Sequence, residues 1–185
     1  MKNSVKNTLK IGAGFIAGLV LAAIVPLAIV WSGLIDMSAT PEPGKIESAL
    51  APWAFDCSMK HHAPAAKNPF ANSVAVLPAG LGHYRENCVV CHGAPDVKPA
   101  DLAQGLNPPA PKLQTDDAQS LRDGEMFWII QNGIRMTGMP AFGPTRSPED
   151  IWHLVTFVRH LPKLTPAERA AFQAATRGEA EHHAK

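Results

Sequence analysis

Residues 86–95 read ENCVVCHGAP, and this stretch decides the fold. Cys88 and Cys91 lie three positions apart, and His92 follows the second cysteine directly. Such a pentad can hold a zinc ion, act as a redox-active dithiol, or attach a haem group through two thioether bonds. The rest of the sequence has to distinguish these three kinds of site.

The zinc and dithiol interpretations lack supporting sequence. Zinc takes four ligands, but no second ligand pair accompanies the pentad, and Cys57, the third cysteine, lies in a different segment. A thioredoxin-like dithiol would need βαβ surroundings, which the sequence does not contain. In a haem site the two thiols fix the porphyrin edge and His92 supplies an imidazole to the iron. The pentad therefore favours one haem c, attached covalently through Cys88 and Cys91.

A second axial ligand is expected in GIRMTGMPAFG, residues 133–143. Most methionines fill hydrophobic cores, but a glycine-rich loop offers no helical face for that purpose. Met139 is favoured over Met136 because a proline stiffens the chain directly after it and the glycine before it lets the backbone come close to the porphyrin. We therefore expect His92 and Met139 to be the axial iron ligands.

Helix signals dominate the second half of the chain. Residues 78–87 and 123–130 are expected to be helical. Ser147 is expected to cap a third helix over 148–161, which carries a regular apolar stripe, and the capping pattern recurs at 165–168. No segment alternates convincingly as a strand would, so the soluble part is predicted to be all-α.

These features together resemble the single-haem class I c-type cytochromes, in particular membrane-anchored bacterial ones similar to the haem domains of terminal-oxidase and dehydrogenase subunits. The resemblance covers 74–162 and rests mainly on CVVCHG at 88–93, PKL at 111–113, GMPAFG at 138–143 and IWHLVTFVRHL at 151–161. It implies a small cytochrome c-like helical domain around one covalent haem. It also implies that the first and last helices of the domain cross, with Gly82 or Tyr84 touching the region of Trp152.

The resemblance further implies a partner for the histidine ligand. A proline carbonyl would accept a hydrogen bond from His92 Nδ1 and orient the ring. Pro111 fits best, and Pro108 and Pro109 remain alternatives. The further residues expected in the haem pocket are Leu113 and Trp128, for the second of which core packing is an equal alternative.

The expected ligand set determines the expected function. With a histidine and a methionine on the iron, both axial positions are filled, which suits transfer of single electrons and not binding of oxygen or peroxide. The partners would be redox proteins: a membrane dehydrogenase or quinol-oxidising complex as donor, and a terminal oxidase or reductase as acceptor. The chain itself is then not an enzyme, although it can be a subunit of one. The alternative is a haem enzyme or gas sensor in which the methionine leaves the iron.

The N-terminus carries a membrane signal. Residues 11–35 contain no charge, and Lys2, Lys6 and Lys10 precede them. This run is long enough to span a membrane, and the lysines would keep the N-terminus in the cytoplasm. The haem domain would then lie in the periplasm, held at the inner membrane by a single pass. A cleaved signal peptide is the alternative, with Met37-Ser38-Ala39 as its best cleavage site. Without the three lysines, 14 basic residues face 16 acidic ones, which argues against a nucleic-acid partner.

The expected organisation has four parts. They are a membrane anchor (1–37, spanning about 11–35), a proline-rich extended arm (38–73), the haem domain (74–163), and a C-terminal helix with a polar tail (164–185). Within the arm, one short helix is conceivable around 46–54. The arm also contains CSMKHH at 57–62, which is either a copper or second metal site, or a free thiol beside solvated histidines.

Overall fold

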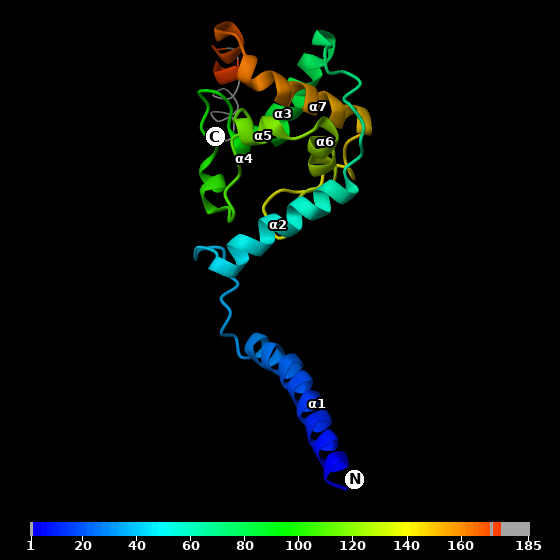
Figure 1. The fold of residues 1–185 in the computed structure, drawn as a ribbon. Coiled ribbons are helices and arrows are strands. Elements are labelled where there is room, and N and C mark those ends of the chain that lie inside the picture. The colour runs from blue at the N-terminus through cyan, green and yellow to red at the C-terminus, as the bar shows by residue number, and fades with distance from the viewer. Residues whose placement is uncertain (1, 171, 175–185) are drawn as a thin grey trace. The chain divides into compact units, whose positions relative to one another are not determined.

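The structure is a computed structural model that describes residues 2–170 and 172–174. The described residues form helices joined by loops and contain no β-strand, which confirms the all-α prediction. The chain divides into two compact units, Met1–Pro41 and Glu42–Lys185 (Figure 1). The elements of the two units are α1 (Lys2–Trp31), α2 (Lys45–His62), η1 (Val74–Val76), α3 (Leu77–Asn87), α4 (Val89–His92), η2 (Asp101–Gly105), α5 (Asp116–Ser120), α6 (Asp123–Asn132), α7 (Pro148–His160) and η3 (Leu161–Lys163).

The first unit consists mainly of α1. Its segment Lys10–Trp31 has 22 residues, a mean hydropathy of 2.6 and no buried residue. At ~1.5 Å per residue it reaches ~33 Å, the thickness of a hydrocarbon core. The helix is compatible with a single-pass membrane anchor, although a signal sequence has the same properties. It ends at Trp31, four residues before the expected end, and Gly33 follows with a φ of 72° that no α-helix contains.

The core of the second unit is built on α7. Figure 1 shows α3 crossing α7, and α6 also packs against α7. The apolar stripe of α7 is buried in these contacts. The largest fully buried side chains are Tyr84, Ile151, Leu154, Val155, Val158 and Leu161.

The start of α7 agrees with the sequence prediction. Ser147 Oγ accepts a hydrogen bond from Asp150 N at 3.2 Å, and Asp150 Oδ2 accepts one from Ser147 N at 3.1 Å. Pro148 occupies the first helical position, where its missing N–H costs nothing. Residues 166–170 and 172–174 are helical, and Thr165 and Glu168 form the same reciprocal pair of bonds at their start.

The crossing of α3 and α7 differs from the expectation in its contact residue. Gly80, and not Gly82, lies at the closest approach: a Cβ at Gly80 would meet Phe157 Cβ at 2.8 Å and the carbonyl oxygen of His153, whereas a Cβ at Gly82 would meet nothing within 4 Å. The expected contact residue is Gly82 or Tyr84, and of these two Gly82 makes no close approach. Tyr84 packs on α7 through Phe157, with ring centroids 5.3 Å apart. The two helices can approach this closely because Gly80 has no side chain.

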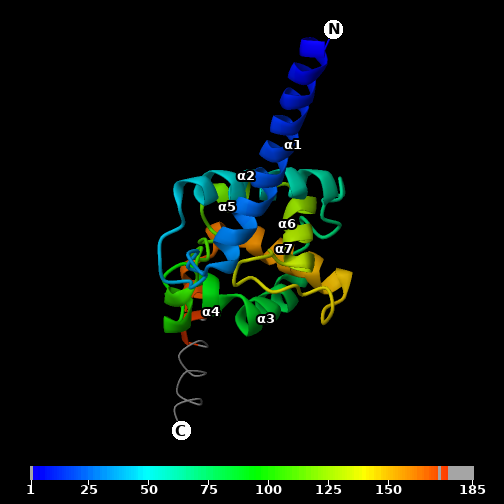
Figure 2. The ribbon, with the colours of Figure 1, turned by 90° about the horizontal axis from the view of Figure 1, so that it is seen from below.

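The segment before α3 is not an extended arm. Residues 45–62 form α2, an α-helix of 18 residues that packs against α6 and includes Pro52. The prediction of a mostly extended segment is wrong here, and the short helix expected at 46–54 is the first half of a longer one. After α2, buried Asn68 donates a hydrogen bond from Nδ2 to Thr156 Oγ1 at 2.8 Å, which fastens the following segment to α7. Figure 2 shows α2 on the side of this unit opposite α3.

Candidate haem-binding site

The pentad lies on a short helix at the end of α3. α3 ends at Asn87, Cys88 N donates to Tyr84 O at 2.8 Å, and α4 continues to His92. His92 N donates to Cys88 O at 2.8 Å, so the two cysteines and the histidine share a single helical turn. Both cysteines are free and half-buried. The position of α3 on α7 therefore also positions these three side chains.

The chain reverses directly after the pentad. Gly93 has a φ of 61°, and a Cβ there would lie 2.5 Å from Val97 O, so only glycine fits this turn. Tyr84 Oη donates a hydrogen bond of 2.6 Å to Gly93 O. Burial raises the pKa of this phenol above its usual value, which keeps it a protonated donor. The hydrogen bond joins the core of the domain to the turn behind His92.

The ring of His92 has one occupied and one free nitrogen. Nδ1 lies 2.7 Å from Pro111 O, which can only accept, so Nδ1 carries the proton and Nε2 keeps its lone pair. Pro111, and neither Pro108 nor Pro109, makes this contact. Burial lowers the pKa of His92, and the hydrogen bond to Pro111 opposes that shift only in part. A neutral, oriented imidazole is the form that binds a metal.

The loop after α6 distinguishes the two candidate methionines. Met136 is 82% exposed, whereas Met139 is half-buried and packs against the hydrophobic core. Two backbone hydrogen bonds hold Met139: its N–H donates to Thr137 Oγ1 at 3.1 Å, and its carbonyl accepts from Ile134 N at 3.2 Å. Gly133, with a φ of 65°, lets the loop fold back, because a Cβ there would lie 2.7 Å from Met139 O. Of the two residues, Met139 is thus the one placed on the core.

The two other residues expected in the haem pocket, Leu113 and Trp128, contact different parts of the domain. Leu113 is half-buried and packs against the same core as Cys88 and Met139. Trp128, also half-buried, stacks on His62 of α2 with ring centroids 6.1 Å apart, so part of its ring covers α2. The structure thus brings Cys88, Leu113 and Met139 to one hydrophobic cluster and assigns Trp128 a contact with another element.

Leu106 is a close neighbour of the Met139 loop that the sequence does not predict. A Cβ at Gly138 would collide with the side chain of Leu106, which follows η2. Leu106 therefore packs where Gly138 leaves room beside Met139. No periodicity or motif marks Leu106 in the long loop 93–115, so the sequence offers no signal for it.

The donor set suits a covalently attached haem. Burial, and then the neighbouring Cys91, raises the pKa of the Cys88 thiol to about 12. Zinc binding needs the thiolate, which a raised pKa disfavours, so the shift argues against a zinc site at Cys88. Among the described residues there is also no cluster of three or more histidine, cysteine, aspartate or glutamate side chains that could hold a metal ion. Two thiols, a neutral imidazole and a thioether are the groups that a haem c would use.

The second candidate metal site, at 57–62, does not assemble in the structure. Cys57 is exposed, whereas Met59 is 3% exposed and belongs to the face of α2 that packs on the domain. His62 stacks on Trp128, and its Nδ1 is bonded to Ser58 O at 2.8 Å. These side chains do not converge on one point.

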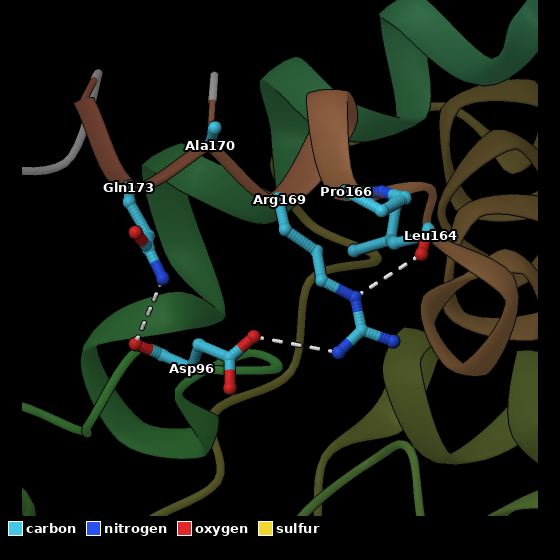
Figure 3. Close-up of a pocket in the computed structure, with 6 residues that line it drawn as sticks. All are labelled: Asp96, Leu164, Pro166, Arg169, Ala170 and Gln173. Atoms are coloured by element: carbon cyan, nitrogen blue, oxygen red, sulfur yellow. Dashed lines mark hydrogen bonds and ion pairs between the residues drawn. The ribbon is translucent and has the colours of Figure 1, made fainter.

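A separate hollow of about 330 Å³ lies near the C-terminal helical residues (Figure 3). Two side chains of the C-terminal segment bind Asp96, which lies in the turn after the pentad. Arg169 Nη1 donates to the Asp96 carboxylate at 3.3 Å, and Gln173 Nε2 donates to the Asp96 backbone carbonyl at 3.4 Å. None of the expected ligands lines the hollow. These two hydrogen bonds hold the C-terminal helical segment against the loop that follows His92.

Comparison with known proteins identifies the domain. Residues 75–158 match the family described as cytochrome C oxidase, cbb3-type, subunit III. The comparison with curated proteins gives no match. The matched residues include the pentad, Pro111, Met139 and most of α7, and domains of this cytochrome c family carry covalently bound haem and transfer electrons. The segment 75–158 is therefore a c-type cytochrome domain, consistent with class I.

Proposed function

We propose that the protein is a membrane-tethered, single-haem cytochrome c that passes single electrons between a donor complex and an oxidase or reductase. Cys88 and Cys91 would hold the haem through thioether bonds, and His92 and Met139 would be its axial ligands. The observation that carries the proposal is the neutral His92 ring, oriented by its 2.7 Å hydrogen bond to Pro111, next to two free thiols.

The chemistry follows from how this chain would hold the group. The haem supplies a one-electron iron couple when bound. The protein would keep both axial positions occupied and hold its ligands in place through the bonds of Met139 to Thr137 and Ile134. Leu113 and Phe142 pack on the same core and would help keep water from the site. A coordination sphere that does not change favours electron transfer over reaction with small molecules.

We further propose that the domain lies in the periplasm, at the inner membrane. The apolar helix Lys10–Trp31 and covalent haem attachment support this location independently. The tether would confine the domain near membrane complexes and raise its effective concentration toward them. Its donor would be a membrane dehydrogenase or quinol-oxidising complex, and its acceptor a terminal oxidase or reductase.

Haem attachment is tested by extracting purified protein with acidic acetone and recording reduced-minus-oxidised spectra together with iron per chain. One iron per chain should stay with the protein. The double variant Cys88→Ala/Cys91→Ala should lose this bound haem, and Cys57→Ala, as the matched control, should keep it. Haem that moves into the organic phase in the unmodified protein would overturn the proposal.

The methionine ligand is tested by a second matched pair. Met139→Ala should lower the reduction potential and open a site for CO or cyanide, whereas Met136→Ala should leave potential and spectrum unchanged, because Met136 is 82% exposed. Unmodified protein that is high-spin at neutral pH and binds CO rapidly would instead support a haem enzyme or gas sensor.

A further inference from the structure

Helix α2 has two apolar faces that point in opposite directions. Phe55, Met59 and His62 lie on the side that packs against the domain, where Met59 is buried and His62 stacks on Trp128. At ~100° per residue, a second row falls on the opposite side of the helix. That row consists of Ile46, Leu50, Trp53 and Cys57, and we call it the outer stripe.

The outer stripe is exposed. Ile46 is 75%, Leu50 53% and Trp53 65% accessible, and Cys57 is an exposed free thiol. Apolar side chains scattered singly over a surface need no explanation, but a row of them on one helix indicates an interaction site. The domain covers only the opposite side of α2, which carries Met59 and His62.

The spacing of the outer stripe is that of a coiled-coil seam. Its members are separated by four, three and four positions, which corresponds to heptad positions d, a, d and a. Ala49 and Ala54 flank the seam on either side at the g and e positions, and their small side chains would let a second helix come close. Lys60 occupies the next d position and ends the stripe.

We propose that the outer stripe binds the outer stripe of a second copy of this chain, as a parallel pair of α2 helices closed by a disulfide between the two Cys57 residues. This inference rests on the proposed function in one respect: it needs α2 outside the cytoplasm, where disulfides persist. Cys57 is also the one cysteine left over when Cys88 and Cys91 hold haem, and an odd cysteine outside the cytoplasm is either paired between chains or a free reactive thiol.

The parallel arrangement follows from the position of the cysteine at one end of the stripe. In a parallel pair every stripe residue meets its own counterpart, so both thiols meet and all the apolar side chains are covered. An antiparallel pair that joined the two thiols would overlap only near Cys57 and leave Ile46 and Leu50 exposed. The linker 32–44 can extend to ~45 Å, so the tether to α1 does not prevent the parallel pairing.

A lipid surface fits the outer stripe less well. Helices that lie on membranes combine a wide apolar face with many lysines and arginines. The stripe is as narrow as a coiled-coil seam, and the first 16 residues of α2, 45–60, carry Lys45 and Lys60 against Glu47 and Asp56, with no basic excess. Charge therefore provides no attraction to anionic lipid, whereas a second copy supplies the matching seam and the matching thiol.

The disulfide is essential because the apolar contact is small. Three apolar side chains per copy fall short of the ~1,200 Å² that a stable interface buries. Confinement in one bilayer and the covalent bond would make up the difference. The bond would form by exchange with a disulfide-bearing thiol oxidant of that compartment: the two Cys57 thiols give up two protons and two electrons, and the oxidant's disulfide becomes two thiols.

The pairing is tested on the full chain in its native membranes, quenched with a thiol-blocking reagent and run on non-reducing gels with haem staining. A haem-stained band at roughly twice the chain mass of 19.8 kDa should appear and return to single mass after reduction. Cys57→Ser should lose the double band and keep haem. Trp53→Glu should also lose the double band although its thiol remains, and Glu47→Gln, which is off the stripe, should keep it.

A cysteine moved to other positions tests the register. With Cys57→Ser as background, Leu50→Cys should restore the double band because it lies on the seam, and Glu47→Cys should not. Equal crosslinking at both positions would indicate random collision and overturn the proposal. A reducible band of another mass would overturn the proposal and indicate a different protein partner. A band at single mass, together with quenching of the Trp53 fluorescence by bromine-labelled lipid, would also overturn it and indicate that the outer stripe lies on a lipid surface. A double band that an immunoblot of the same gel detects but haem staining does not would refute the proposed function and not the pairing.

Discussion

The close approach of α3 and α7 at Gly80 allows a sharp test of the fold that carries the haem site. In Gly80→Ala the new methyl group would lie 2.8 Å from Phe157 Cβ and nearer still to the backbone oxygen of His153. A backbone oxygen inside a helix cannot turn away as a side chain does, so α3 and α7 would have to separate. Overpacking costs ~1–3 kcal/mol, and a clash with backbone that cannot turn away places this one in the upper half of that range, ~2–3 kcal/mol.

Alanine also gains helix propensity over glycine, ~1 kcal/mol in a helix interior, and this gain reduces the net loss. We expect Gly80→Ala to lower the free energy of unfolding by ~1–2 kcal/mol. Gly82→Ala is the matched control on the same helix: its methyl group meets nothing within 4 Å, so the propensity gain should make the protein more stable by up to ~1 kcal/mol. The two variants should therefore move in opposite directions.

The measurement is thermal unfolding of the full chain in detergent, followed through tryptophan fluorescence or the haem absorption band. Far-ultraviolet circular dichroism is avoided because α1 is expected to stay helical in detergent. At ~4 °C per kcal/mol for a domain of this size, the midpoints of the two variants should differ by ~4–12 °C. Equal midpoints for Gly80→Ala and Gly82→Ala would show that α3 and α7 do not cross at Gly80.

Three further outcomes are expected. Tyr84→Phe removes the hydrogen bond to Gly93 O and leaves this buried carbonyl without its donor, so the free energy of unfolding should fall by ~1–2 kcal/mol in the same thermal unfolding experiment. An unchanged midpoint would contradict that bond. Arg159→Ala should lower the free energy of unfolding by about 2 kcal/mol, and Arg159→Lys should restore only part of that loss. The reason is that the guanidinium donates two hydrogen bonds to Asp123 Oδ1, from Nε at 3.0 Å and from Nη2 at 2.9 Å, and lysine cannot replace both. Full recovery by lysine would refute this reasoning. The backbone N–H of Thr165, then its hydroxyl, then His160 lower the pKa of Glu168 to about 2 from 4.5, so its contribution to stability is present above pH 4.5 and lost as the pH falls toward 2. Titration of this carboxyl by NMR should confirm the shift, and a midpoint near 4.5 would exclude the capping bonds.

The elements that could be predicted from sequence are those whose local signals and packing agree. For α7, the Ser147 cap, Pro148 and the apolar stripe all point to one helix, and its stripe is the buried side. The pentad could be predicted because its chemistry depends on spacing within one helical turn. The glycine at which α3 and α7 cross could not be predicted, because Gly80 and Gly82 lie on the same helix and only the position of α7 distinguishes them.

The sequence indicates only the first half of helix α2, and the failure for the rest has a physical reason. Its apolar residues form two stripes on opposite sides, one against the domain and one outward, so their periodic signals cancel along the sequence. Pro52 further resembles a loop signal, although it lies in the half of α2 whose apolar residues are exposed. A helix with apolar residues on two opposite sides looks irregular when a single apolar stripe is sought.

The two expected iron ligands depend on α7 although neither lies on it. α3 packs across α7 and ends one residue before Cys88, so the crossing at Gly80 also sets the position of His92. α6 packs on the same helix and ends at Asn132, after which the bonded loop places Met139 on the core. A change that loosens α7 should therefore disturb both ligands together, whereas a change in the Met139 loop should disturb only one.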